Sequence, residues 1–322
     1  MGLTPRWRRL LALGARLGLT LFAISLLTFG LLYLAPGDPA DVILGAQSET
    51  ATPDKVAELR ERLGLDRPWP EQYLDWLARA MRGDLGASFA SGEPVATLIA
   101  ERFGATLELA AATLVLILVL SSLTGLLAAA RPAGLFDQGL RWLAILTQSV
   151  PGFLLGLMLI YVFALTLGWL PVFGRDGFAS LILPTIALGL GAALVQGRIL
   201  RAELLEVQGQ DYVRFARAKG LSESLILWRH VLRNALTGIL TIWGTTVGRL
   251  LGGAVLIETV FAWPGLGRLL VEAVIGRDLP VIQGAVLVLT LAYVGANLLV
   301  DLLQGLLDPR LAAAPSGTHD DR

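Results

Sequence analysis

The sequence predicts an all-α membrane protein with six transmembrane helices, a long external insertion after the first helix and a structured loop before the fifth. Hydrophobic residues make up 55% of the 322 residues and charged residues only 16%, against roughly 25% charged residues in an ordinary soluble domain. Five long stretches lack charge and a sixth contains only Arg249. Each can supply the roughly 20 residues that a bilayer requires. The stretches are residues 17–35, 109–130, 142–174, 177–197, 234–257 and 279–300.

Residues 1–16 are expected to form a cytoplasmic N-terminus and residues 17–35 the first span. The apolar run is too long for the core of a signal peptide, and no small-x-small cleavage site follows it clearly, so we expect an uncleaved helix. Arginines set the orientation, because short loops rich in Lys and Arg stay in the cytoplasm. Arg6, Arg8, Arg9 and Arg16 precede the first span without an acidic residue, and residues 198–233 carry seven basic residues. Both termini, including residues 308–322, and this loop are therefore expected in the cytoplasm.

The external insertion, residues 36–104, is expected to contain two short helices. Thr52 and Pro53 suit the first positions of a helix that Gly64 would end. A second helix is expected at residues 70–81. Its apolar side would be formed by Tyr73, Trp76 and Leu77. The insertion is either a small cap on the membrane domain or a contact surface for a delivered substrate, since a connection beyond about 12–15 residues is often functional.

Two stripes of small residues recur at four-residue spacing within the predicted spans. Such stripes let helix backbones approach closely in lipid. We expect packing within the chain, with a subunit interface as the alternative for a stripe that is left over. The stripes are Gly189, Ala193 and Gly197, and Gly244, Gly248 and Gly252.

The basic cytoplasmic loop has a helical pattern followed by a specified turn. From residue 198 to 218, apolar positions alternate with charged ones at near-helical spacing. Lys219 suits the last turn of a helix, Gly220 the left-handed position after it and Leu221 the accompanying hydrophobic contact. Ser222 can cap a following short helix, whose dipole favours an acidic residue in the first turn. The pattern predicts a rigid projection, which favours a docking surface for a protein that drives the membrane part.

Several kinds of chemistry are excluded by composition. Lysine occurs only at Lys55 and Lys219, and neither follows a G-x-x-x-x-G loop, so a phosphate-binding P-loop cannot form. With His230 and His319 as the only histidines and no cysteine, histidine metal clusters, thiolate catalysis and disulfides are excluded. The formal net charge is zero, so no overall field attracts nucleic acid. No carboxylate lies in the middle of a span, which disfavours a proton-coupled carrier.

Arg249 is the one charge expected near a bilayer midplane. A charge inside the membrane is costly without a partner and is a functional-site hypothesis by default. Arg249 could bind an anionic group of a substrate, such as a peptide carboxylate. The alternatives are a partner subunit or a carboxylate near the end of a span. The candidates for such a carboxylate are Glu108, Glu258 and Asp301.

Short segments spread over nearly the whole chain carry a recognisable pattern. The loop DYVRFARAKGLS occupies residues 211–222 and is followed by RHVLRNAL at 229–236. The other segments are LAPGDP (34–39), GDLGAS (83–88), ATLELA (105–110), SVPGF (149–153), GWLP (168–171), ETVFAWPGLGR (258–268) and DPR (308–310). Together they resemble the permeases of ABC importers, most closely the dipeptide, oligopeptide and nickel branch. The chain departs from this pattern at residues 237–238, where it has Thr-Gly and many relatives have Leu-Pro. This difference affects the angle at which the fifth span enters the membrane, not the family resemblance.

The resemblance implies a permease for peptides or similar small solutes in a bacterial inner membrane, with residues 36–104 in the periplasm and residues 105–307 as a five-helix core. The loop at 198–233 would carry a coupling helix seated in a groove of an ATPase subunit. The coupling residues implied by the resemblance are Asp211, Tyr212, Arg214, Ala216, Ala218, Lys219, Gly220, Leu221 and Ser222.

The implied partners are a second, different permease, two ATPase subunits and a periplasmic substrate-binding protein. This chain would hold no cofactor and catalyse no reaction, because ATP and Mg would be bound by the ATPases. The alternative is a self-sufficient secondary carrier or channel, against which the rigid loop and the absence of mid-span carboxylates argue. An intramembrane enzyme is a more distant alternative, since the spans contain no evident pair of a nucleophile and a general base.

Overall fold

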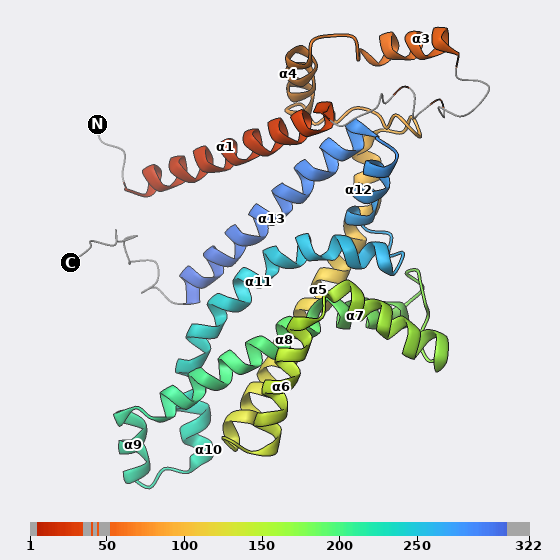
Figure 1. Ribbon diagram of the computed structural model, residues 1–322. Helices are drawn as coiled ribbons and strands as arrows, with labels where there is room; N and C mark the ends of the chain where they lie inside the picture. The colour runs from red at the N-terminus through yellow and green to blue at the C-terminus, as the bar shows by residue number, and fades with distance from the viewer. Residues whose placement is uncertain (1–4, 35–39, 41–43, 45–51, 308–322) are drawn as a thin grey trace. The chain divides into compact units, whose positions relative to one another are not determined.

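A computed structural model describes residues 5–34, 40, 44 and 52–307 (Figure 1). Expectations for the tail at 308–322 and for most of the LAPGDP segment lie outside these residues. Within them the regular structure is helical, apart from an isolated antiparallel bridge between Ala87 and Pro94. The chain divides into two compact units. The first comprises Met1–Thr106 and Pro264–Val294, and the second Leu107–Trp263 and Gly295–Arg322.

The first unit holds the N-terminal helix, the insertion and the helices near the C-terminus. Its elements are α1 (Pro5–Leu34), α3 (Pro53–Leu63), α4 (Trp69–Ala80), the start of α5 (Val95–Ala130), α12 (Leu266–Ile275) and the first part of α13 (Leu279–Leu307).

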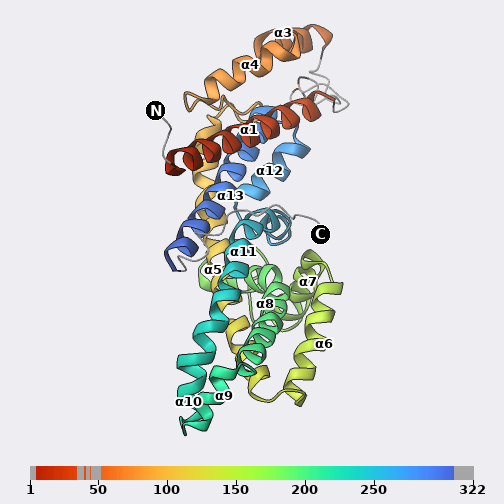
Figure 2. The same cartoon turned by 90° about the vertical axis from the view of Figure 1, so that its left-hand side faces the viewer.

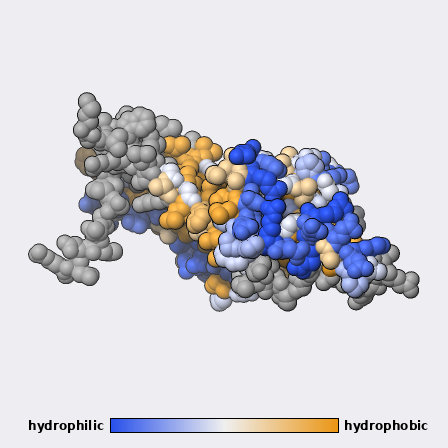
Figure 3. Space-filling model, turned by 90° about the horizontal axis from the view of Figure 1, so that it is seen from above, coloured by the Kyte–Doolittle hydropathy of each residue, from blue (hydrophilic) through white to orange (hydrophobic). Residues whose placement is uncertain are grey.

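Both helices predicted in the insertion are confirmed. Helix α3 begins after Thr52 and ends at Gly64, whose φ of 69° is left-handed. Helix α4 lies one residue earlier than predicted and buries Tyr73 and Trp76. The Tyr73 ring packs edge-on to Phe29 of α1 at a centroid distance of 5.4 Å. The insertion therefore packs on the first predicted span through α4, as the cap interpretation expects. In the view of Figure 3, hydrophilic residues gather over α3 and α4, while the surface along α1 is largely hydrophobic.

A buried carboxylate fixes the turn at the end of the insertion to the start of α13. Asp278 is 4% exposed. Its carboxylate accepts hydrogen bonds from the Ser88 hydroxyl and from the backbone N–H groups of Phe89, at 3.0 Å, and Ala90, at 3.3 Å. A buried carboxylate needs such donors to offset its lost hydration, so the segment after GDLGAS has a defined position within this unit.

The second unit contains the rest of α5, the helices from α6 to α11 and the last part of α13. The helices from α6 to α11 are α6 (Leu135–Ser149), α7 (Gly152–Leu159), the π-helix η1 (Ile160–Thr166), α8 (Phe178–Gln208), α9 (Asp211–Ala218), α10 (Glu223–Ile226), the π-helix η2 (Leu227–Val231) and α11 (Leu232–Val260). Helices α9 and α10 lie together at the end of this unit where α8 ends and α11 begins (Figures 1 and 2).

The third predicted span, residues 142–174, is not one continuous helix. Helices α6 and α7 meet at an angle of 103°. The break falls at Val150 and Pro151, and Val150 has extended backbone angles of −105° and 121°. Pro151 has no N–H for a helical hydrogen bond and forces the preceding residue out of the helical region. One continuous span was predicted because residues 142–174 contain no charged residue, and this composition carries no sign of the break.

Four helices of the described residues are long and apolar enough to cross a membrane, or up to five if α6 and the segment Gly152–Thr166 count as one bent span. The four are Val95–Ala130, Phe178–Gln208, Gly238–Val260 and Leu279–Val300. Helix α1 contributes a shorter apolar helix, Leu17–Gly30. A multi-span helical membrane protein is thus confirmed, and the count of six spans stays a prediction.

The stripe on α8 packs within the chain, as expected. A β-carbon at Gly189 would lie 3.2 Å from the Leu116 side chain, and one at Gly197 would clash with the Thr124 hydroxyl on α5. Ala193, between them, is fully buried beside Ile117. Gly252 on α11 differs, because a β-carbon there would meet no atom within 4 Å.

Candidate functional site

The loop that was predicted to lie in the cytoplasm consists of two short helices rather than a continuation of α8. The single helix expected from residue 198 to 218 is interrupted at Gly209 and Gln210. The Gly209 N–H closes the end of α8 on the Leu205 and Glu206 carbonyls. Gln210 has an extended backbone, with φ of −70° and ψ of 149°, and stands before α9 as its N-cap. Glycine and the polar residue after it offer a helix end, and this signal was missed in the sequence.

The turn between α9 and α10 has the geometry that its residues predict. Gly220 has a φ of 77°. Its N–H donates to the Arg217 carbonyl at 2.9 Å, and the Leu221 N–H donates to the Ala216 carbonyl at 3.4 Å. These two bonds form a Schellman motif, which ends a helix with a left-handed residue. Ser222 takes the N-cap position, but its hydroxyl makes no capping hydrogen bond.

The inner side of the loop is a hydrophobic core. We call residues 211–231 the docking loop. Val213 and Ala216 of α9 and Ile226 and Val231 of the following segment are buried. They form one cluster with the end of α5 and with parts of α8 and α11. The other buried members of the cluster are Ala129, Leu200, Leu204, Ala235 and Ile239. Ala216, which sequence analysis placed among the coupling residues, therefore holds the loop on its support.

The outer side of the loop exposes large apolar side chains. Phe215 is 62% exposed and Trp228 65%. The outer apolar face consists of Tyr212, Phe215, Leu221, Leu225 and Trp228. Sequence analysis named Tyr212 and Leu221 but missed the other three. Large apolar side chains that stay exposed together on one short loop make it a candidate protein or membrane interaction site.

Polar contacts fix the position of this face. The Asn234 side-chain amide donates to the Tyr212 hydroxyl at 3.0 Å, and the Lys219 ammonium lies 4.6 Å from the centre of the Phe215 ring. Arg217 pairs with Glu223 through two hydrogen bonds of 2.7 and 3.2 Å. The remaining predicted residues are all exposed around the apolar residues. They are Asp211, Arg214, Ala218, Lys219, Gly220 and Ser222.

A cavity of about 390 Å³ separates part of the docking loop from the end of α5. Its polar lining comes mainly from Arg217, Glu223, Ser224 and Gln208, and its apolar lining includes Leu126, Ala129, Leu204, Ile226 and Val231. The loop is thus anchored at its core and open on one flank.

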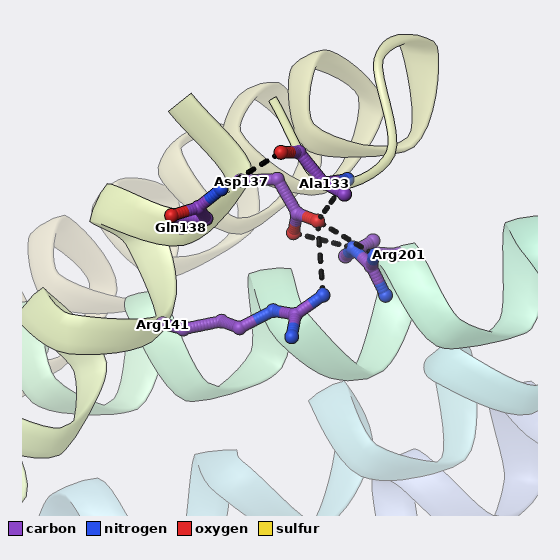
Figure 4. A network of polar contacts seen from close by, with 5 residues as sticks. All are labelled: Ala133, Asp137, Gln138, Arg141 and Arg201. Carbon is purple, nitrogen blue, oxygen red and sulfur yellow. Dashed lines mark hydrogen bonds and ion pairs between the residues drawn. The ribbon is translucent and has the colours of Figure 1, made fainter. Parts of the chain in front are cut away.

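A buried ion pair lies near this support and was not predicted. Asp137, in the first turn of α6, is fully buried. Its carboxylate accepts a hydrogen bond of 2.7 Å from Arg201 of α8. Arg141 and the backbone of Ala133 donate to the same carboxylate (Figure 4).

Arg249 lies at the middle of the candidate span Gly238–Val260 and is exposed on the isolated chain. Its guanidinium is 3.5 Å from the Thr246 hydroxyl. Thr246 in turn accepts a hydrogen bond of 2.8 Å from the buried Gln196 side chain of α8. The Oε1 atom of Gln196 has no hydrogen-bond partner among the described residues. The cation and the hydroxyl of this span and the amide of α8 therefore form a short polar chain, and no ion pair joins Arg249 to an acidic residue in the described part of the chain.

Comparison with known proteins places the chain in a family. Residues 121–313 match the family described as binding-protein-dependent transport system inner membrane component, and residues 8–110 match the corresponding N-terminal family. The chain belongs to this family. It is a permease, a membrane subunit of ABC importers that is itself non-catalytic.

The permease is similar to curated relatives over nearly its whole length. It is 40% identical to the di/tripeptide transport system permease protein DppB of Pseudomonas aeruginosa (strain UCBPP-PA14), covering 92% of this chain and 97% of the relative. It is 41% identical to the glutathione transport system permease protein GsiC of Escherichia coli (strain K12), covering 91% and 94%. Among solved structures, it shares its fold with the inward-facing MetNI methionine ABC transporter, with a TM-score of 0.54 and 20% identity over 66% of this chain and 96% of that one.

Proposed function

We propose that this permease forms part of the translocation pathway of an ATP-driven importer in a bacterial inner membrane. It would span the membrane six times, with both termini in the cytoplasm and residues 36–104 in the periplasm. A second, homologous permease would complete the pathway. Two ATPase subunits would bind ATP and Mg, and a periplasmic binding protein would deliver the solute.

The observation that carries this proposal is the outer apolar face of the docking loop. Burying apolar surface stabilises an association by roughly 25 cal/mol per Å², and a face held rigid in advance loses little entropy on binding. Phe215 and Trp228 are the large aromatic residues of the kind that dominate binding energies. Since this chain has no P-loop, the surface supports docking of a protein that hydrolyses ATP.

Docking is tested with two exposed tryptophans from different parts of the chain. Trp228→Ser should reduce co-purification of the ATPase subunits at least tenfold. Trp69→Ser, which replaces a 42% exposed tryptophan of α4, should leave it unchanged. Equal co-purification of both variants would contradict the assignment of the loop.

Transport is tested in proteoliposomes that contain the complete complex. Peptide uptake should require both ATP and the binding protein. Uptake by the purified permease without ATP would instead establish the secondary carrier as the function.

The substrates that we propose are short peptides with a free carboxylate. This rests on the di/tripeptide and glutathione permeases that the chain resembles and on Arg249. A guanidinium at the membrane midplane is costly unless an anion or water compensates it, and substrate sites of transporters commonly lie at that depth. Thr246, itself fixed by the hydrogen bond from Gln196, contacts the guanidinium on one side, and the exposed remainder of the guanidinium is available to a passing carboxylate.

Arg249→Gln should reduce uptake of a dipeptide with a free C-terminus about tenfold more than uptake of its C-terminal amide. Arg249→Lys should retain part of this discrimination, because it keeps the charge. Loss of permease assembly in Arg249→Gln, with restoration by an acidic-to-neutral change in the second permease, would show that Arg249 pairs with the partner instead.

A further inference from the structure

The carboxylate of Asp137 connects two helices from a fully buried position (Figure 4). Arg201 of α8 faces it with two nitrogens: Nη2 donates to Oδ2 at 2.7 Å, and Nε forms an ion pair with Oδ1. Arg141, one turn further along α6, donates to Oδ2 at 3.1 Å. Arg201 lies 64 residues from Asp137, so it joins α6 to α8, whereas Arg141 makes a contact within α6 alone.

The same carboxylate fixes the turn that leads into α6. The Ala133 N–H donates to Asp137 at 2.9 Å, and the Ala133 carbonyl accepts a hydrogen bond of 2.9 Å from the Gln138 side chain. Ala133 has a φ of 61°, a left-handed conformation that an alanine adopts only where its surroundings enforce it. The first turn of α6 and the turn before it therefore form one rigid piece, attached to α8 through Arg201.

Helix α8 connects this piece to the docking loop. Leu200 and Leu204 of α8 are fully buried in the hydrophobic core under the docking loop. Arg201 is the neighbour of Leu200 and points to Asp137. A displacement of the loop core must therefore act on the same turns of α8 that hold the Asp137 carboxylate. An apolar cluster also joins α6 to α8 and consists of Leu140, Ala144 and Leu194 with Ala128 of α5.

We propose that Asp137 and Arg201 are positioning residues that make α6 move together with the docking loop. This inference rests on the proposed function, in which an ATPase displaces that loop. A charged pair with fixed hydrogen-bond directions holds both distance and orientation, while apolar contacts tolerate sliding. A buried pair is rarely required for stability, because apolar residues of similar volume can replace it without loss. In this permease the pair fixes the distance and orientation of α6 relative to α8.

The experiment uses the whole importer in proteoliposomes and measures peptide transported per ATP hydrolysed. The apolar double variant Asp137→Leu/Arg201→Met should assemble, unfold at a temperature near that of the wild type and hydrolyse ATP. Its transport per ATP should fall at least tenfold. Arg141→Met is the matched control, because it removes a hydrogen bond from the same carboxylate without breaking the connection to α8, and it should transport nearly as the wild type does.

Wild-type transport per ATP in the assembled double variant would overturn the inference and reduce the pair to a structural contact. If the double variant does not assemble, Arg201→Lys decides, because lysine keeps the charge but cannot face both carboxylate oxygens with a fixed fork. Assembled Arg201→Lys should show reduced transport per ATP, and normal transport would again overturn the inference. Failure of the wild-type complex to couple transport to ATP would contradict the proposed function itself, which separates the two failures.

Discussion

Replacement of Gly220 tests how much the shape of the docking loop contributes to ATPase binding. The φ of 77° at Gly220 is costly for other residues, and a β-carbon added there would meet no atom within 4 Å. The β-carbon of Gly220→Val therefore adds backbone strain without a clash. A left-handed conformation costs an L-residue about 1–2 kcal/mol, and a β-branched residue is a particularly poor fit. If the strained turn opens, a cost of this size weakens binding about 5- to 30-fold, since every 1.4 kcal/mol is tenfold.

The assay is equilibrium binding of the ATPase subunits to the permease in nanodiscs. Gly220→Asn is the matched control, because asparagine enters the left-handed region readily, and it should bind within about twofold of the wild type. Membrane insertion should be normal in both variants. Equal affinity of the valine and asparagine variants would show that the Schellman turn does not set the docking geometry.

Two further predictions concern a helix contact and a surface pair. Gly197→Ala places a methyl group against the Thr124 hydroxyl and 3.3 Å from the Ser121 carbonyl. It should destabilise the permease by about 1–3 kcal/mol through overpacking, seen as a lower unfolding temperature, while Gly252→Ala in open space should not. Hydrogen bonds from Arg217 lower the pKa of Glu223. The pair therefore stabilises the loop at pH values above the usual pKa range of glutamate, and this stabilisation is lost as the pH falls through the lowered pKa. The protection factors of the loop amides, which are corrected for the intrinsic pH dependence of exchange, should thus be constant near neutral pH and fall only in acid, whereas pH-independent protection equal to that of Glu223→Gln would refute this contribution.

The local features of the docking loop could be predicted from sequence because they depend on neighbouring residues. Lys219, Gly220 and Leu221 specify the turn within three positions, and Thr52, Pro53 and Gly64 likewise bound α3. The break after α8 and the bend at Pro151 also have local signals in Gly209 and in the proline itself. Neither break was predicted. The charge-free composition continues across Pro151, and the helical spacing of apolar residues continues across Gly209.

The buried ion pair could not be predicted in the same way. Asp137 lies in the first turn of a helix, where an exposed carboxylate is favoured by the helix dipole. Its burial depends on Arg201, which approaches only when α6 packs on α8. The same holds for Gln196 and Thr246, whose hydrogen bond joins residues 50 positions apart. Side chains that act through tertiary contacts leave no periodic signal in one sequence.

The rigidity of the docking loop must come from the membrane helices beneath it. Helix α9 has eight residues, and isolated helices shorter than about 12–15 residues are marginal in water. Fully burying a valine contributes about 1.5–3 kcal/mol, so Val213, with Ala216 and Ile226, can hold what α9 alone cannot. These residues are buried against α8 and α11. Because the loop is folded by the two helices that it is proposed to move, a force on its outer apolar face reaches them without an intervening flexible segment.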